Sequence, residues 1–165
     1  MPPTGNPNLS PPASVKALSI IHAGLIIGVV LFLAVVYSIT PQKGFLISAD
    51  PLVIASIFLA LFGMAFSGKL FSLIISKISA DSSLKQKIAT YQTASIARFA
   101  LLEGPSLFSV VIYMLTGNLL VVAIVGVLLL FFISIRPIKS KVIGDLQLDY
   151  NEQAELDGSS NNQGI

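Results

Sequence analysis

Residues 98–108 read Arg-Phe-Ala-Leu-Leu-Glu-Gly-Pro-Ser-Leu-Phe, which places a carboxylate and a Gly-Pro pair inside an apolar stretch typical of a membrane span. Inserting an ionised side chain at the centre of a bilayer costs roughly 2.5–3.5 kcal/mol on insertion scales, so Glu103 is expected to face protein or water and to have a partner. Gly104 and Pro105 predict a helix kink one turn above Glu103, because Pro105 removes one backbone hydrogen bond and collides with the carbonyl of Leu101.

The composition of the whole chain is that of an integral membrane protein. Of its 165 residues, 54% are hydrophobic and only 11% are charged, whereas soluble domains carry about 25% charged residues. The lysines and arginines flank apolar runs, so they are read as topology signals and no nucleic-acid partner is expected. The absence of cysteine excludes disulfides and thiolate chemistry. The expected partners are the lipid bilayer and either further copies of the chain or another membrane-complex subunit.

The apolar runs predict an all-α fold, an integral membrane bundle of four helices. The membrane domain covers residues 15–136, with spans at about 17–39, 51–72, 97–117 and 118–136. Residues 73–96 show helical spacing of apolar side chains with lysines between them, which predicts an extended helical hairpin between spans two and three. A cleaved signal peptide is the alternative for the first run, but that run is too long and no small-x-small cleavage site follows it.

Both ends of the chain are predicted to be polar tails. Residues 1–14 contain five prolines together with Gly, Asn and Ser, a composition that predicts disorder. Residues 137–165 are basic first and acidic afterwards. Within them, Asp149 and Glu152 have the spacing of a capping box, which predicts a short helix over residues 150–156.

The distribution of basic residues predicts the orientation. Nine of the ten lie at Lys16, within residues 69–98, or directly after the fourth span, and only Lys43 lies in another connector. An even number of spans puts the three basic regions on one side of the membrane, which the positive-inside rule makes the cytoplasm. The sequence therefore predicts a multi-pass protein, of bacterial inner-membrane type, with both termini and the hairpin in the cytoplasm.

Glu103 has candidate partners on other helices. At about 1.5 Å per residue, His22 lies roughly 9 Å beyond Lys16 and Glu103 roughly 7.5 Å beyond Arg98, both measured from the cytoplasmic edge. His22 is therefore the first expected partner and Lys69 the second, whereas Arg98 is five residues away on the same helix and off the common face. The pair is interpreted either as a titrating proton or ion site, or as a polar clamp that fixes packing while Arg98 and Lys69 reach the lipid headgroups.

Small residues indicate where helices pack closely. Gly24 and Gly28 form a GxxxG pattern in the first span, and Gly63 and Ser67 form a small-xxx-small pattern in the second. Such spacing lets helix backbones approach each other in lipid. The interface can lie within the bundle or between protomers, and the pattern does not distinguish the two.

The inventory of reactive groups argues against catalysis. One histidine, no cysteine and one intramembrane acid cannot assemble a three-ligand metal centre or a bis-histidine haem site from one copy, so no metal or cofactor is expected. No glycine-rich nucleotide loop is present, and no serine is placed by a motif beside His22. The sequence predicts a non-enzymatic scaffold or accessory subunit. The alternative is a proton- or ion-coupled membrane component that uses Glu103 and His22.

One family resemblance rests on the opening stretch. A basic hairpin followed by a span with a single glutamate, residues 100–108, resembles the ion-carrying hairpin of the rotary ATPase proteolipids, the subunit c family. This resemblance covers spans two and three and implies that Glu103 is the protonated carboxylate. The sequence departs from the family in two ways: span two lacks the packed glycine repeat, and a longer lysine-bearing extension replaces the polar Arg-Gln-Pro loop.

Overall fold

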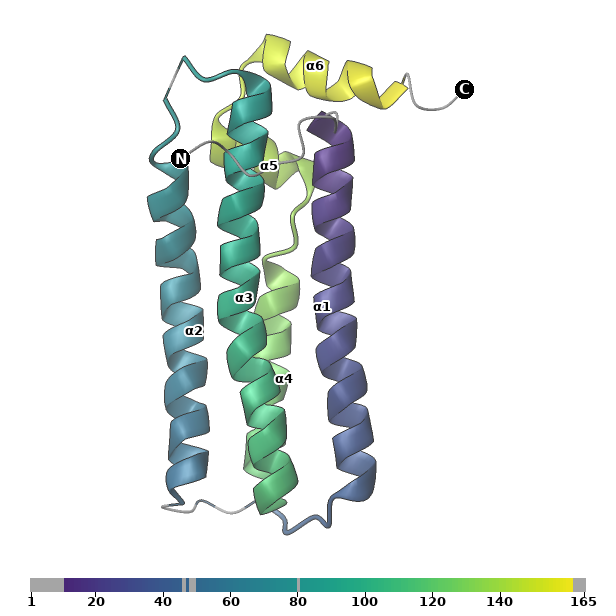
Figure 1. Ribbon diagram of the computed structural model, residues 1–165, viewed down its shortest axis with the longest axis vertical. Coiled ribbons are helices and arrows are strands. Elements are labelled where there is room, and N and C mark those ends of the chain that lie inside the picture. The colour runs from purple at the N-terminus through teal and green to yellow at the C-terminus, as the bar shows by residue number, and fades with distance from the viewer. Residues whose placement is uncertain (1–10, 46, 48–49, 80, 162–165) are drawn as a thin grey trace. The chain divides into compact units, whose positions relative to one another are not determined.

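The computed structural model describes residues 11–45, 47, 50–79 and 81–161, and in the last helix it describes side chains as far as Asp157. Within these residues the chain forms six α-helices and no strand, so the predicted all-α class is confirmed. The helices are α1 (Pro11–Ile39), α2 (Pro51–Ile75), α3 (Leu84–Thr116), α4 (Leu119–Ser134), α5 (Lys139–Leu146) and α6 (Tyr150–Asn161) (Figure 1). Residues 1–10 of the predicted N-terminal tail and residues 162–165 lie outside the described part.

Helix length and composition make this a multi-pass membrane protein. Helices α1, α2 and α3 are each long and apolar enough to cross a membrane. Helix α4 has only 16 residues, and it meets the same test only together with α5, from which it is bent by 73°, as in a broken span or a re-entrant loop. Among the described residues the chain therefore has three spans, or up to four.

The contacts divide the chain into two compact units, which are described separately. The first, here called the charged unit, comprises Met1–His22, Lys69–Arg98 and Arg136–Ile165. The second, the apolar unit, comprises Ala23–Gly68 and Phe99–Ile135. Helices α1, α2 and α3 each contribute to both units.

The core of the apolar unit combines side chains from four helices. It contains Val29 and Val36 of α1, Val53 of α2, Val110, Ile112 and Tyr113 of α3, and Val121 and Val125 of α4. Helices α3 and α4 are antiparallel neighbours, since the rings of Phe99 and Phe132 lie 5.7 Å apart. Their connector needs a glycine, because Gly117 has φ +67°, a left-handed conformation that glycine adopts without steric strain.

The connectors of the apolar unit are tied together by backbone hydrogen bonds. The amide of Lys43 donates to the carbonyl of Gly117 at 2.9 Å, and the amide of Leu119 donates to the carbonyl of Gly44 at 3.0 Å. Asn118 caps α4 by accepting a hydrogen bond from the amide of Leu120. These bonds satisfy helix-end groups that have no partner within the helix.

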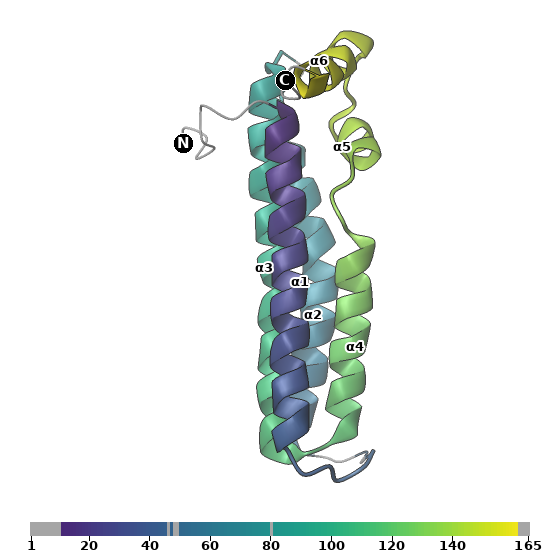
Figure 2. The same cartoon turned by 90° about the vertical axis from the view of Figure 1, so that its right-hand side faces the viewer.

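The charged unit is built from helix ends and from the C-terminal segment. Ser83 and Gln86 form a reciprocal capping box at the start of α3, with side chain to backbone distances of 3.1 and 3.4 Å. Helix α5 contributes the buried side chains Val142 and Leu146. Figure 1 shows α6 beginning beside the first turns of α3 and running toward the start of α1, and Figure 2 shows α5 and α6 as two short helices joined by a turn.

Two helix boundaries differ from the sequence prediction, and one helix was not predicted. Helix α1 begins at Pro11, inside the stretch 1–14 predicted to be disordered, and prolines are tolerated in a first turn because their missing amide has no helical partner there. Helix α6 continues to Asn161 instead of ending at residue 156. Helix α5 lies in the stretch before residue 150 for which no helix was predicted.

Candidate functional site

Charge is concentrated in one of the two units. The charged unit holds nine of the ten basic residues and six of the eight acidic residues. In the apolar unit, Lys43 and Asp50 lie in a connector, and Glu103 is the one charged residue within a helix. The charged unit is therefore the part of the molecule equipped for polar chemistry.

Helix α6 is held on α3 by a buried ion pair. The ammonium nitrogen of Lys87 lies 2.5 Å from Oε1 of Glu152, and both side chains are largely buried. The other oxygen of Glu152 accepts a hydrogen bond from the amide of Asp149 at 3.0 Å, while Asp149 Oδ1 accepts from the amide of Glu152 at 2.8 Å. Glu152 thus both caps α6 and attaches it to α3.

A second polar contact joins α3 to α5. The hydroxyl of Tyr91 donates to Oδ2 of Asp145 at 3.4 Å. Tyr91 lies before the predicted span 97–117. Burial is the main cause that raises the pKa of its phenol to about 12, and the negative charge of Asp145 is the second cause. The phenol therefore stays protonated at neutral pH and acts as a hydrogen-bond donor.

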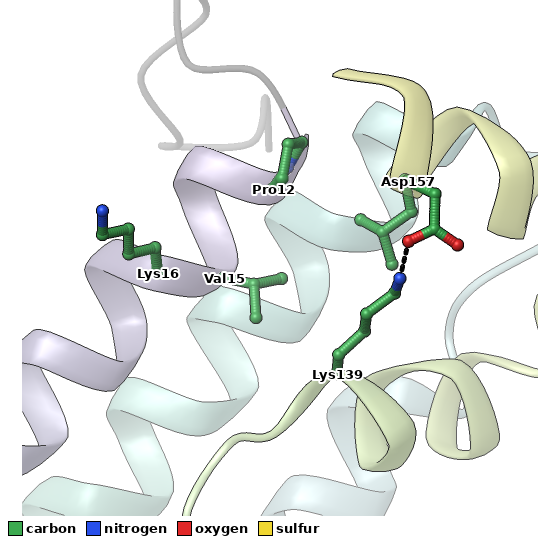
Figure 3. A pocket seen from close by; sticks show the side chains of 6 residues that line it. Pro12, Val15, Lys16, Lys139 and Asp157 are labelled. Atoms are coloured by element: carbon green, nitrogen blue, oxygen red, sulfur yellow. Dashed lines mark ion pairs between the residues drawn. The ribbon is translucent and has the colours of Figure 1, made fainter. Parts of the chain in front are cut away.

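Hollows open among the described residues of the charged unit, and two of them bear on its chemistry. The larger, about 470 Å³, is mainly polar and is lined by Ile75, Ser76, Ile78, Ser79, Lys87, Asp145, Leu146, Gln147, Asp149 and Glu152. The smaller, about 210 Å³, lies between the start of α1 and the helices α5 and α6. Figure 3 shows its lining, in which Lys139 pairs with Asp157 while Lys16 points away. Among the described residues, no group of three or more His, Asp or Glu side chains could hold a metal ion.

A row of buried hydroxyl groups runs along the part of α3 that belongs to the apolar unit. Ser106, Ser109 and Tyr113 are all fully buried, and they follow Glu103 at helical spacing. Ser109 shares a 2.8 Å hydrogen bond with the equally buried Ser56 of α2. The hydroxyl of Tyr113 has no hydrogen-bond partner within the described part of the chain.

The four residues predicted to form a polar site fall into different units. Glu103 lies half-buried on α3 in the apolar unit. His22, Lys69 and Arg98 belong to the charged unit, where His22 is buried and Lys69 is exposed. The pairing of Glu103 with His22 or Lys69 stays a prediction.

The residues predicted to mediate packing have different surroundings. A methyl group added at Gly63 would lie 2.5 Å from the carbonyl oxygen of Leu101 and 3.0 Å from Cγ of Pro105, so α2 approaches α3 closely there. Ser67 is buried and donates to the carbonyl of Met64. A methyl group at Gly24 or Gly28 would meet no atom within 4 Å apart from its chain neighbours and the backbone of its own helix, so an interface at these two glycines stays a prediction.

Helix α3 continues through the Gly104-Pro105 pair without a break in its helical assignment. Ser106 donates to the carbonyl of Leu102 at 2.7 Å, which adds a side-chain bond beside the amide that Pro105 lacks. The predicted kink therefore involves no interruption of the helix, and its angle stays a prediction.

Sequence reasoning missed the buried serines and the contacts of the C-terminal segment. In an apolar span, a serine is ambiguous because it can satisfy its hydroxyl on its own helix. The helical spacing of residues 103, 106, 109 and 113 was the available signal.

Comparisons with protein-family models, curated proteins and solved structures found no match to this chain. They give no support for a relationship to the subunit c family.

Proposed function

We propose that this protein is a non-enzymatic membrane scaffold or accessory subunit whose charged unit binds a partner protein. The observation that carries this proposal is the folding of the C-terminal segment onto the first turns of α3 through the pair Lys87–Glu152. A surface that is already ordered loses less conformational entropy on binding than a loose tail. The charged unit therefore offers a preorganised surface.

The exposed face of α6 supplies a contact point for that partner. Tyr150, the first residue of α6, is 85% exposed although it belongs to the charged unit. Tyrosine is enriched among the residues that contribute most to protein–protein binding, since it combines apolar area with a hydroxyl. Tyr150 is the residue proposed to anchor the partner.

The proposed location is a bacterial inner membrane, with the charged unit and both termini in the cytoplasm and the four apolar helices forming an integral bundle. The presence of nine of the ten basic residues in the charged unit supports this orientation through the positive-inside rule. The bundle is proposed to work beside further copies of itself or as part of a membrane complex.

A single-cysteine experiment tests orientation and partner binding together, because the chain has no native cysteine. A membrane-impermeant maleimide is expected to label Asn151→Cys only in broken cells and Lys43→Cys in intact cells. A crosslinker attached at Asn151→Cys is expected to capture a protein, and Tyr150→Ala is expected to reduce that adduct several-fold. Labelling of Asn151→Cys in intact cells contradicts the orientation, and an adduct unchanged by Tyr150→Ala contradicts the binding surface.

A second candidate function is supported by the buried hydroxyls of the apolar unit. Proton and ion pathways through membranes use chains of polar groups that face the bundle interior. Ser106, Ser109 and Tyr113 extend such a row from Glu103 along α3. The second candidate is therefore a proton- or ion-coupled component that uses Glu103 and His22.

Vesicles containing the purified protein test this second candidate. Under an imposed potassium diffusion potential, the wild-type protein is expected to carry protons, measured with an enclosed pH-sensitive dye. Glu103→Gln keeps the shape of the side chain but removes its charge, so it is expected to abolish the flux. Asp50→Asn is the control, because Asp50 lies in a connector. Equal flux in wild-type and Glu103→Gln vesicles, or none in either, contradicts this function.

A further inference from the structure

The guanidinium group of Arg98 is held over an aromatic ring. Its central carbon lies 5.2 Å from the ring centroid of Phe71. Phe71 is itself buried and packs edge-on against Tyr91, with ring centroids 5.5 Å apart. A cation over an aromatic face is attracted by the ring quadrupole. Phe71 therefore positions the guanidinium within the charged unit.

Arg98 has a donor that the described chain does not satisfy. Its Nε is buried and has no hydrogen-bond partner in the described part of the chain. Oδ2 of Asp145, a carboxylate of the same unit, accepts the hydrogen bond from Tyr91. A buried donor without an acceptor is rare in proteins and points to a ligand or water that supplies one.

The position of Arg98 indicates the nature of that ligand. The charged unit passes into the apolar unit at four points, and its residues there are His22, Lys69, Arg98 and Arg136. Lys69, Arg98 and Arg136 carry a positive charge. At the first three junctions the helix that continues, α1, α2 or α3, is apolar enough to span a membrane. Basic residues at the ends of membrane helices lie at the level of the lipid headgroups, where they attract anionic lipids.

We propose that Arg98 binds the phosphate of an anionic phospholipid, and that the cation–π contact with the ring of Phe71 orients its guanidinium. Planar guanidinium groups bind phosphate oxygens through two parallel hydrogen bonds, and Nε is one of the donors available for that geometry. Lys69 and Arg136, the cations at two of the other junctions, favour a lipid of net negative charge over a zwitterionic one. The site does not depend on the partner-binding role proposed above.

Thermal unfolding of the detergent-purified protein tests the site. A ligand that binds only the folded state raises the melting temperature. The melting temperature is measured by circular dichroism. Phosphatidylglycerol is expected to raise that of the wild-type protein by roughly 5 °C, and phosphatidylcholine is expected to raise it by much less. Arg98→Gln is expected to lose most of this rise. Lys77→Gln removes the same charge from an exposed turn of the charged unit and is expected to keep it.

Further arms separate the site from its alternatives. Phe71→Leu keeps an apolar side chain but removes the aromatic ring beneath the guanidinium. A smaller increase in melting temperature with phosphatidylglycerol in this variant therefore supports the proposal even where Arg98→Gln does not fold. Equal rises with glycerol phosphate and with phosphatidylglycerol would assign the site to free phosphate and overturn the lipid. Equal losses in Arg98→Gln and Lys77→Gln would indicate diffuse charge attraction and overturn the site, as would a wild-type protein that phosphatidylglycerol leaves unchanged.

Discussion

Replacing Lys87 by alanine is expected to detach α6 from α3, because it leaves the carboxylate of Glu152 buried without its cation. Removing one partner of a buried ion pair costs about 3–5 kcal/mol, most of which is the penalty of the unpaired charge. The cost falls on one short helix, so α6 should open locally while the rest of the protein stays folded. Hydrogen exchange of the backbone amides of residues 150–157 measures this, and exchange is expected to accelerate at least 100-fold.

The ion pair between Lys139 and Asp157 provides a matched control, since it also attaches α6 but its side chains are about half exposed. Exposed ion pairs contribute about 0–1 kcal/mol, so Lys139→Ala is expected to accelerate the same exchange less than tenfold. Similar acceleration in the two variants would show that the buried pair is not the main attachment of α6. The same Lys87→Ala variant is expected to lose the Tyr150-dependent crosslink, which connects the local contact to the proposed function.

Several helix starts follow directly from local sequence signals. Helix α2 begins at Pro51, where Asp50 accepts a hydrogen bond from the amide of Leu52 at 2.9 Å. Helix α6 begins at Tyr150, directly after the first residue of the capping box formed by Asp149 and Glu152. A cap and its first turn lie within four residues of each other, so their pattern can be recognised without knowledge of the tertiary fold.

Helix α5 shows why other elements were not predicted. It has eight residues, and an isolated helix of that length is unstable in water. Its buried residues Val142 and Leu146 need a surface that other parts of the charged unit provide. Long-range contacts of this kind, such as the bond from Tyr91 to Asp145, are not encoded in the spacing of neighbouring residues.

The part of the candidate site that could be predicted is the charged residue Glu103. A carboxylate inside an apolar run is costly to place in lipid, so the sequence alone identifies it. The sequence could not indicate that Ser56 and Ser109 would meet, since they are on different helices and each has other ways to satisfy its hydroxyl. It also could not indicate that Arg98 would lie over Phe71, because the contact depends on how α2 and α3 pack.

Replacing Gly63 by alanine is expected to destabilise the apolar unit by about 1–3 kcal/mol, the usual cost of an added methyl group in a packed interior. The new methyl group would lie 2.5 Å from the carbonyl oxygen of Leu101, and this oxygen belongs to the backbone, so α2 and α3 must move apart. Within α3 the carbonyl of Leu101 also lacks its usual hydrogen-bond donor, because the residue four positions later is Pro105, which has no amide hydrogen. Denaturant titration in detergent micelles, followed by circular dichroism, measures the loss.

Gly68→Ala is the control on the same helix, since a methyl group there meets nothing within 4 Å and alanine favours a helix by up to about 1 kcal/mol. Gly63→Ala should therefore unfold at lower denaturant than wild type and Gly68→Ala at equal or higher denaturant. The reverse order would show that α2 and α3 do not approach each other at Gly63.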